Sequence, residues 1–81
     1  MYYLYLLLCS GKTLYTGISD DPERRLATHR SGKGSKYVRA HLPVELIYSE
    51  ELPNRSTALK REAEVKSWTR AQKIARLGLK L

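Results

Sequence analysis

The chain has 81 residues with 15 Lys and Arg against 8 Asp and Glu, so its formal net charge is +7 and its length suits one small domain, residues 1–81. The charge favours polyanionic partners such as nucleic acid, while the longest apolar run, Met1–Cys9, is too short for a membrane span of roughly 20 residues and lacks the basic leader of a signal peptide. The single cysteine and the lack of a Cys/His cluster with zinc-ligand spacing exclude an internal disulfide and a structural zinc site, and we expect a cytoplasmic protein, outside any membrane, whose fold depends on packing.

Two β-favouring segments separated by a turn signal open the chain. Tyr2–Cys9 is rich in Tyr and Leu, Ser10–Lys12 favours a turn, and Thr13–Ile18 returns to β-favouring residues. This pattern predicts a β-hairpin whose loop is the Ser-Gly-Lys sequence.

That loop fixes the register of the hairpin. It pairs Leu7 with Tyr15 and Tyr5 with Gly17. Because side chains alternate along a strand, one sheet face then carries Tyr3, Tyr5, Leu7, Tyr15 and Gly17. Tyr5 and Tyr15 become diagonal neighbours, and Gly17 leaves space between the backbone and a ligand.

A helix is predicted to follow the hairpin. The Asp-Asp-Pro sequence at residues 20–22 favours a helix start, because either aspartate can cap and proline fits the first helical position. Arg25 and His29 are four residues apart, so both lie on one side of this helix. Leu26 is the expected core contact.

The middle of the chain is predicted to form a loop and a third strand. Ser31–His41 is punctuated by glycines and carries Lys and Arg around Tyr37, so we expect a loop there. Pro43–Leu52 favours a strand centred on residues 44–48.

Helices are predicted to complete the chain. From Ser56, apolar and small residues recur at helical spacing at Ala58, Leu59, Ala63, Val65 and Trp68. Thr69 and Gln72 match a capping box, which predicts a break and a short last helix with Ile74 and Leu77 as core contacts. The expected fold is an α/β (α+β) domain with a three-stranded antiparallel sheet and helices packed on it.

Two tripeptides of the hairpin resemble those that define the GIY-YIG nuclease superfamily. They are Tyr3–Tyr5 and, after the turn, Tyr15–Gly17. Arg25 and His29 follow at ten and fourteen residues after the second tyrosine, and Ala58–Lys66 resembles the later helix whose glutamate binds the metal. The resemblance covers nearly the whole chain, is greatest to the small stand-alone bacterial members, and implies a GIY-YIG-like fold.

The resemblance also implies a metal-dependent DNA endonuclease, and elementary chemistry suits the residues to that role. Glu62 would hold one Mg²⁺, with Mn²⁺ as an alternative, and Arg25 would pair with two phosphate oxygens. Tyr5 or Tyr15 would position the attacking water or relay its proton, and His29 would accept it. Which of the three is the general base stays open.

The chain departs from the family pattern at several positions. Tyr3 stands in place of the first glycine, and Thr16 replaces the isoleucine of the second tripeptide. A basic residue that follows this tripeptide in some nucleases is Ile18 here, and their asparagine after the metal helix has no clear counterpart. Lys33 or Lys36 is a candidate to supply the missing positive charge.

Basic residues cluster in sequence around the predicted site and suit the phosphate backbone of duplex, branched or single-stranded DNA. The set comprises Lys12, Arg24, Arg30, Lys33, Lys36 and Arg39, with Tyr37 able to stack on a base and Gly17 beside the backbone. With about five phosphate contacts, log affinity for duplex DNA should fall with log salt at a slope near −4 to −5. A solvated basic surface is the alternative interpretation.

Two other functions fit the same sequence. One is a nucleic-acid-binding or accessory module that keeps the fold and has lost the chemistry. The other is a basic domain that docks on an acidic protein or a ribonucleoprotein. With so short a chain, a nuclease would choose its substrate by shape, such as a flap, nick or branch, rather than by sequence.

Overall fold

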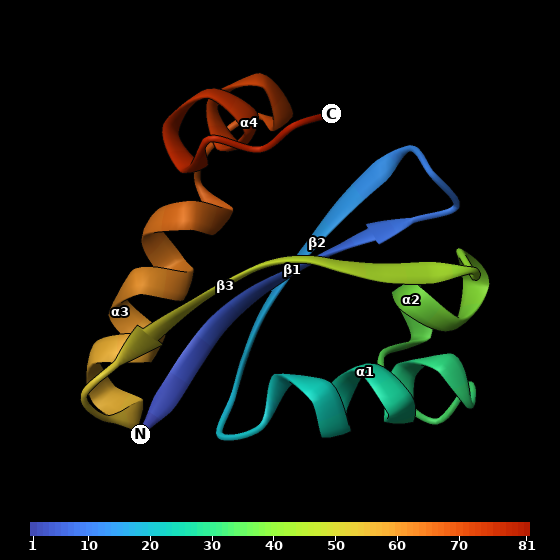
Figure 1. Cartoon of the computed structure of the whole chain (residues 1–81), viewed down its shortest axis with the longest axis horizontal. Helices are drawn as coiled ribbons and strands as arrows, with labels where there is room; N and C mark the ends of the chain where they lie inside the picture. The colour runs from blue at the N-terminus through green and yellow to red at the C-terminus, as the bar shows by residue number, and fades with distance from the viewer.

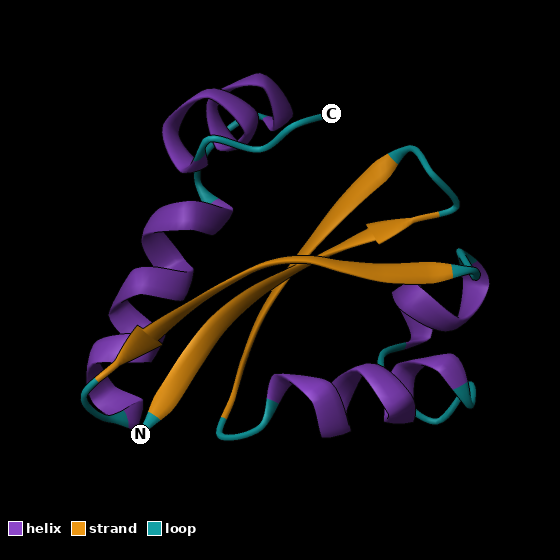
Figure 2. Ribbon diagram, viewed as in Figure 1, coloured by secondary structure: helices purple, strands orange, loops and turns teal.

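A three-stranded antiparallel sheet forms the centre of the fold (Figure 2). The computed structural model describes residues 1–81 and contains the strands β1 (Tyr2–Cys9), β2 (Thr13–Ser19) and β3 (Val44–Leu52). The order across the sheet is β2-β1-β3, so β1 lies in the middle and pairs with both neighbours. Its nearly continuous run of Leu and Tyr fits a strand that is covered on both faces.

The hairpin has the predicted register. Leu7 lies opposite Tyr15, and Tyr5 lies opposite Gly17. Ser10 and Gly11 adopt positive φ values of 54° and 68°, which turn the chain tightly between β1 and β2. The expected sheet and the expected pairing of its first two strands are therefore confirmed.

Four helices cover the two faces of the sheet (Figure 1). The first pair, α1 (Pro22–Arg30) and α2 (Lys36–Ala40), packs on the face that carries Tyr5. The second pair, α3 (Arg55–Lys66) and α4 (Arg70–Leu77), lies on the opposite face. None of these helices has the length and apolarity that a bilayer crossing demands.

The alternation of side chains along β1 builds a separate core on each face. One core comprises Tyr5, Leu7, Cys9, Leu26, Val38 and Val44. The other comprises Leu4, Leu6 and Val65, with Trp68, Leu77 and Leu79 among the residues packed against it. The centre of the hairpin is thus held from both sides, which gives the residues on β1 and β2 fixed positions.

The helix starts follow the predicted capping chemistry. Of the two candidate aspartates, Asp21 is the cap of α1, and its carboxylate accepts from the backbone N–H of Arg24 at 3.1 Å. Asn54 caps α3, which begins one residue before the predicted position. The capping box of Thr69 and Gln72 is present at the start of α4.

The prediction of a loop over Ser31–His41 is wrong for its second half, which forms α2. Ser35 caps this short helix by accepting from the backbone N–H of Tyr37 at 3.1 Å. Val38 is completely buried against the first core and holds the helix in place. This five-residue helix has a single buried apolar residue, so its sequence shows no helical repeat of apolar residues. The glycines and charged residues around it therefore favoured the prediction of a loop.

The last helix also differs in detail from its prediction. Leu77 packs against the second core as expected, whereas Ile74 is only half-buried and belongs to neither core. Leu59 on α3 is 39% exposed and is not a core contact either. The C-terminal helix therefore covers the sheet less tightly than its apolar residues suggest.

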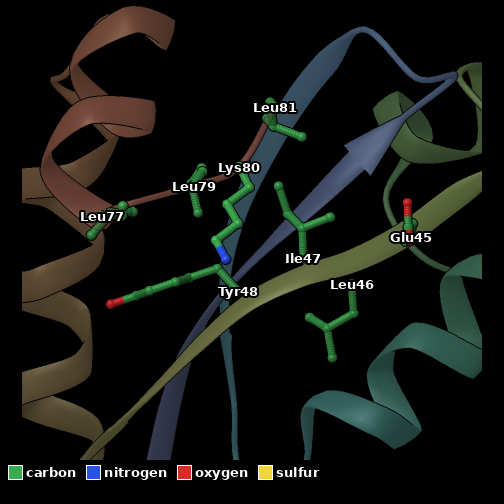
Figure 3. A pocket seen from close by; sticks show the side chains of 9 residues that line it. Glu45, Leu46, Ile47, Tyr48, Leu77, Leu79, Lys80 and Leu81 are labelled. Atoms are coloured by element: carbon green, nitrogen blue, oxygen red, sulfur yellow. The ribbon is translucent and has the colours of Figure 1, made fainter.

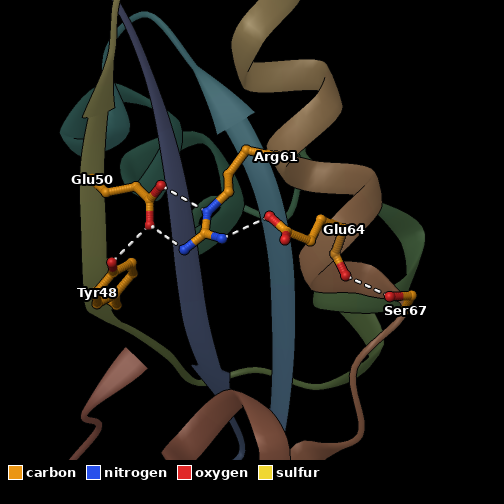
Figure 4. Close-up of polar contacts among 5 residues, drawn as sticks. All are labelled: Tyr48, Glu50, Arg61, Glu64 and Ser67. Atoms are coloured by element: carbon orange, nitrogen blue, oxygen red, sulfur yellow. Dashed lines mark hydrogen bonds and ion pairs between the residues drawn. The ribbon is translucent and has the colours of Figure 1, made fainter. Parts of the chain in front are cut away.

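An ionic network on the outer side ties α3 to β3 (Figure 4). The Arg61 guanidinium donates to both carboxylate oxygens of Glu50, at 2.9 and 3.2 Å, and to Glu64 at 2.7 Å. The Tyr48 hydroxyl donates to Glu50 at 2.7 Å, and the guanidinium carbon of Arg61 lies 5.3 Å from the ring centroid of Trp68. Glu50 and Glu64 are both part of this network, whereas Glu62 on α3 takes no part in it.

Candidate active site

A buried hydrogen bond between Tyr5 and His29 forms the innermost part of the candidate site. The hydroxyl of Tyr5 on β1 lies 3.2 Å from Nε2 of His29 on α1. The two residues are 1% and 0% exposed. Leu26 is buried beside them as predicted, but His29 is the more deeply buried residue of the helix. The side of α1 that packs on the sheet therefore carries a buried polar side chain, His29, as well as the apolar core contact Leu26.

Tyr15 and Arg25 lie at the rim of this pair, and both are half-buried. The ring centroid of Tyr15 is 6.5 Å from that of Tyr5 and 5.4 Å from that of His29, which it meets edge to face. The charge of Arg25 acts on both Tyr5 and His29. The structure thus brings together the four residues predicted on the hairpin and the first helix.

Burial sets the protonation states of the inner pair. It raises the pKa of the Tyr5 hydroxyl, and the nearby Arg25 guanidinium offsets part of that rise. Burial lowers the pKa of His29, and repulsion from Arg25 lowers that pKa further. At neutral pH, Tyr5 is therefore a protonated phenol and His29 a neutral imidazole.

Two glycines allow this pair to pack as it does. A Cβ atom on Gly17 would lie 2.6 Å from the hydroxyl oxygen of Tyr5, and a Cβ atom on Gly34 would overlap Nδ1 of His29. The space above Gly17, which the sequence assigned to a ligand, is occupied by the end of the Tyr5 side chain. Nδ1 of His29 is buried with no hydrogen-bond partner.

Glu62 approaches the site from the other face of the sheet, since it lies on α3. Its side chain is 19% exposed, and Oε2 lies 3.3 Å from Nζ of Lys66. Its charge contributes to the raised pKa of Tyr5, so its field reaches the inner pair. Glu62 thus pairs with Lys66, while Glu64 pairs with Arg61.

Glu62 offers a single carboxylate to a metal ion. The structure has no group of three or more His, Cys, Asp or Glu residues that could hold an ion. Mg²⁺ is often held by one or two carboxylates, with waters and substrate phosphates as its remaining ligands. Glu62 would suit a magnesium site of that type, whose remaining ligands would be waters and phosphate oxygens.

The cations predicted to bind nucleic acid do not form a single surface. Lys33, Lys36 and Arg39 are exposed on α2 and the segment before it. Arg24 forms an ion pair with Asp20 one turn away on the chain. Only the first three are free of ionic partners on the α2 side.

The remaining two predicted cations lie elsewhere. Nε of Arg30 donates to the backbone carbonyl of Val44 at 3.3 Å, so this side chain helps to join α1 to β3. Lys12 lies in the hairpin turn, where its backbone carbonyl accepts from Nε of Arg70 at 2.9 Å. Lys12 is therefore a neighbour of α4 rather than of α2.

Tyr37 is part of an aromatic stack that closes the outer side of the site. Its ring lies nearly parallel to Tyr15, with centroids 6.2 Å apart, and to His41, with centroids 4.2 Å apart. Nδ1–H of His41 donates to the Tyr37 carbonyl at 2.6 Å. The sequence analysis missed His41, although its position four residues after Tyr37 would place the two rings together on a helix.

A groove of about 390 Å³ lies apart from these residues (Figure 3). It runs between β3 and the C-terminal segment, and its lining is mostly apolar, including Leu46, Ile47 and Leu79. It shares no residue with the tyrosine and histidine site. The groove is therefore separate from the candidate chemistry.

The buried imidazole predicts a pH dependence of stability. Its pKa is lowered in the folded protein relative to about 6.5 in the unfolded chain, so below that pH the unfolded state binds more protons. The unfolding free energy should therefore fall below pH 6.5, by up to about 1.4 kcal/mol per pH unit, until the folded-state pKa is reached. Urea unfolding between pH 5 and 7.5 measures this slope.

The control for this measurement is the other histidine. His29→Gln should remove the part of the slope that lies just below pH 6.5, whereas His41→Gln should retain it. Equal slopes in wild type and His29→Gln would contradict burial of a neutral imidazole.

Comparison with known proteins identifies the family and the fold. The model of the GIY-YIG catalytic domain matches residues 1–75. A UPF0213 protein of Streptococcus agalactiae is 51% identical over 72 residues, which cover 89% of this chain and 82% of the relative. A UPF0213 protein of Natronomonas pharaonis is 47% identical over 72 residues, covering 89% and 85%.

Solved structures give the same result for the fold. The solution NMR structure of a protein from E. faecalis has a TM-score of 0.66 at 44% identity, covering 95% of this chain and 82% of that one. The solution NMR structure of a UPF0213 protein from Bacillus halodurans has a TM-score of 0.61 at 37% identity, covering 96% and 84%. With the family model matching residues 1–75 and close relatives over most of its length, the chain belongs to the GIY-YIG family.

Proposed function

We propose that the protein is a metal-dependent DNA endonuclease that selects its substrate by structure rather than by sequence. The observation that carries this proposal is the buried hydrogen bond between Tyr5 and His29, with Tyr15 and Arg25 at its rim. A neutral imidazole behind a phenol is a proton acceptor, and the guanidinium beside it is a phosphate ligand. If these side chains served only to pack the core, burying polar groups would add no stability over apolar residues of similar size.

The directions of the pKa shifts favour one proton path. Because burial raises the pKa of Tyr5, its phenolate is disfavoured as a base near neutral pH. Because the pKa of His29 is lowered, its imidazole is neutral near neutral pH and has a free lone pair for a proton, although the same burial and the Arg25 charge make it a weaker base than a free histidine. The attacking water would pass a proton to the Tyr5 oxygen as the Tyr5 proton moves to Nε2 of His29, which leaves the phenol unchanged and the imidazole charged.

Arg25 and Glu62 would stabilise the charge that this attack creates. The guanidinium of Arg25 can bind two phosphoryl oxygens at once, a geometry that lysine cannot match. Glu62 would hold a divalent ion, which would supply positive charge to the phosphoryl group and the departing 3′ oxygen. Tyr15, half-buried between the inner pair and solvent, would orient the attacking water.

A specific observation also favours a second function, a DNA-binding module with weak or absent chemistry. Glu62 is ion-paired with Lys66, and no second carboxylate assists it. The asparagine and the basic residue of some family nucleases are missing as well. The exposed basic side chains would then bind phosphates without cleaving them.

The test is an assay of purified protein on labelled single-stranded, duplex, nicked and branched DNA with Mg²⁺, Mn²⁺ or EDTA. Denaturing gels should show products that need the metal and that accumulate on one substrate shape. A Glu62→Ala preparation, purified identically, controls for a contaminating nuclease. DNA shifts without any products would favour the binding module, and neither shifts nor products would reject both functions.

A further inference from the structure

Five cations lie beside β2 or at its ends on the side of α3 and α4, and only Lys12 among them belongs to the set predicted from the sequence to bind DNA. These edge cations are Lys12, Arg55, Lys66, Arg70 and Lys73. We propose that they bind the sugar-phosphate backbone of a DNA strand that runs along β2 and passes Glu62. This proposal rests on the proposed function and adds the path of the substrate.

The first end of this path is at the hairpin turn. Nε of Arg70 donates to the carbonyl of Lys12 at 2.9 Å, although the two residues are 58 positions apart. The start of α4 is thereby held against the turn between β1 and β2. Both side chains are exposed and neither has an acidic partner in the structure.

The middle of the path is at Thr16 on β2. Nζ of Lys73 donates to the hydroxyl of Thr16 at 3.1 Å, and the half-buried ammonium has no carboxylate partner. Burial and repulsion from Lys66 lower the pKa of Lys73. Lys66 and Lys73 thus bring two ammonium groups close together, and Glu62 is the one carboxylate paired with them. The excess positive charge favours the binding of another anion, such as a phosphate.

The second end is a hollow of about 290 Å³ between the starts of α1 and α3. Its charged lining consists of Arg24, Arg25 and Arg55 against the single carboxylate of Asp20. Asp20 pairs with Arg24, so Arg25 and Arg55 face this hollow without an acidic partner. Because Arg25 also lies at the rim of the candidate site, the path is continuous with that site.

The dimensions agree with one strand of DNA. The seven residues of β2 span about 23 Å, which equals six to seven nucleotides at about 3.4 Å per nucleotide of B-form strand. Arg55, Glu62 and Lys66 follow one another at intervals of seven and four residues, so they share a side of α3. Glu62, the candidate metal ligand, therefore has Arg55 on one side and Lys66 on the other along α3. A phosphate within a DNA strand has a further phosphate on each side, and these two cations could bind them. Figure 4 shows α3 beside β2 along this edge.

The test compares two triple variants with the same change of charge. The edge variant is Arg55→Gln/Arg70→Gln/Lys73→Gln, and the control is Lys33→Gln/Lys36→Gln/Arg39→Gln on the α2 side. Fluorescence anisotropy with a labelled 15-base-pair duplex in EDTA, at a series of salt concentrations, gives the slope of log affinity against log salt. Circular dichroism checks that both variants are folded.

The edge variant should reduce the magnitude of the slope by about 2.7, which is 0.9 for each lost phosphate contact, and the control should change it by less than about 0.9. An equal reduction in both variants, or a reduction in the control alone, would overturn the proposal. That result, with metal-dependent cleavage still present in wild type, would leave the proposed function intact. Wild type that fails to bind this duplex at any salt concentration would overturn the proposal, and the proposed function would fall with it only if the cleavage assay also gave no products on any of its DNA shapes.

Discussion

Glu62→Ala should abolish metal-dependent cleavage, with a loss of at least about 10³-fold, and should leave DNA affinity in EDTA undiminished. Glu62 is the candidate metal ligand and the one carboxylate whose charge raises the pKa of Tyr5, so its removal takes away the group that would hold the ion. Binding should survive because the substitution removes a negative charge from a protein of charge +7 and frees Lys66 from its ion pair. Gel assays of cleavage and anisotropy of binding measure the two effects on the same preparations.

Glu64→Ala is the matched control. It lies two residues further along α3, removes the same charge, and pairs with Arg61 on the outer side. Its side chain is 57% exposed, so its loss should cost less than about 1 kcal/mol of stability and leave cleavage unchanged. If both alanine variants were inactive, general loss of charge or of fold would be the cause.

Glu62→Gln tests whether cleavage needs the negative charge of Glu62 or only the size of its side chain. The amide keeps the volume of the side chain but has no negative charge for a divalent ion. It should be as inactive as Glu62→Ala. Cleavage by Glu62→Gln at the wild-type rate would contradict the assignment of Glu62 as the metal ligand.

Local patterns predicted much of the sheet and the hairpin side of the site. A three-residue turn leaves one register for β1 and β2, and that register determines which side chains share a face. The capping residues likewise marked where α1 and α4 start. The proximity of Tyr5 and Tyr15 follows from the hairpin register, whereas that of His29 also depends on how α1 packs on the same face.

Other features depend on contacts between distant segments and could not be predicted in that way. The helix α2 exists because Val38 packs into a core made by other elements. The position of Lys73 beside Thr16 depends on how α4 docks, 57 residues further along the chain. The sequence analysis therefore placed the cations near the site by their position in the chain, and only the structure distinguishes the α2 side from the β2 edge.

The close approach of Tyr5 to Gly17 predicts a large effect of a single methyl group. Alanine at a strand position normally raises stability over glycine by roughly 0.5–1 kcal/mol, because glycine has more freedom to lose on folding. Here the new Cβ would lie 2.6 Å from the Tyr5 hydroxyl oxygen and 2.7 Å from Cζ. The ring cannot move away because it is 1% exposed and its hydroxyl is bonded to His29. Gly17→Ala should therefore lower the unfolding free energy by about 1–3 kcal/mol.

A second substitution tests the cause of this loss. In a Tyr5→Leu background the hydroxyl and the outer ring atoms are absent, so Gly17→Ala should become neutral or stabilising. The coupling between the two positions, measured by urea unfolding of the four proteins, should reach about 1–3 kcal/mol. Each kcal/mol should also appear as a shift of about 4–8 °C in Tm. Equal destabilisation by Gly17→Ala in both backgrounds would contradict this explanation. The loss would then come from the backbone conformation at residue 17 and not from a clash with the Tyr5 hydroxyl.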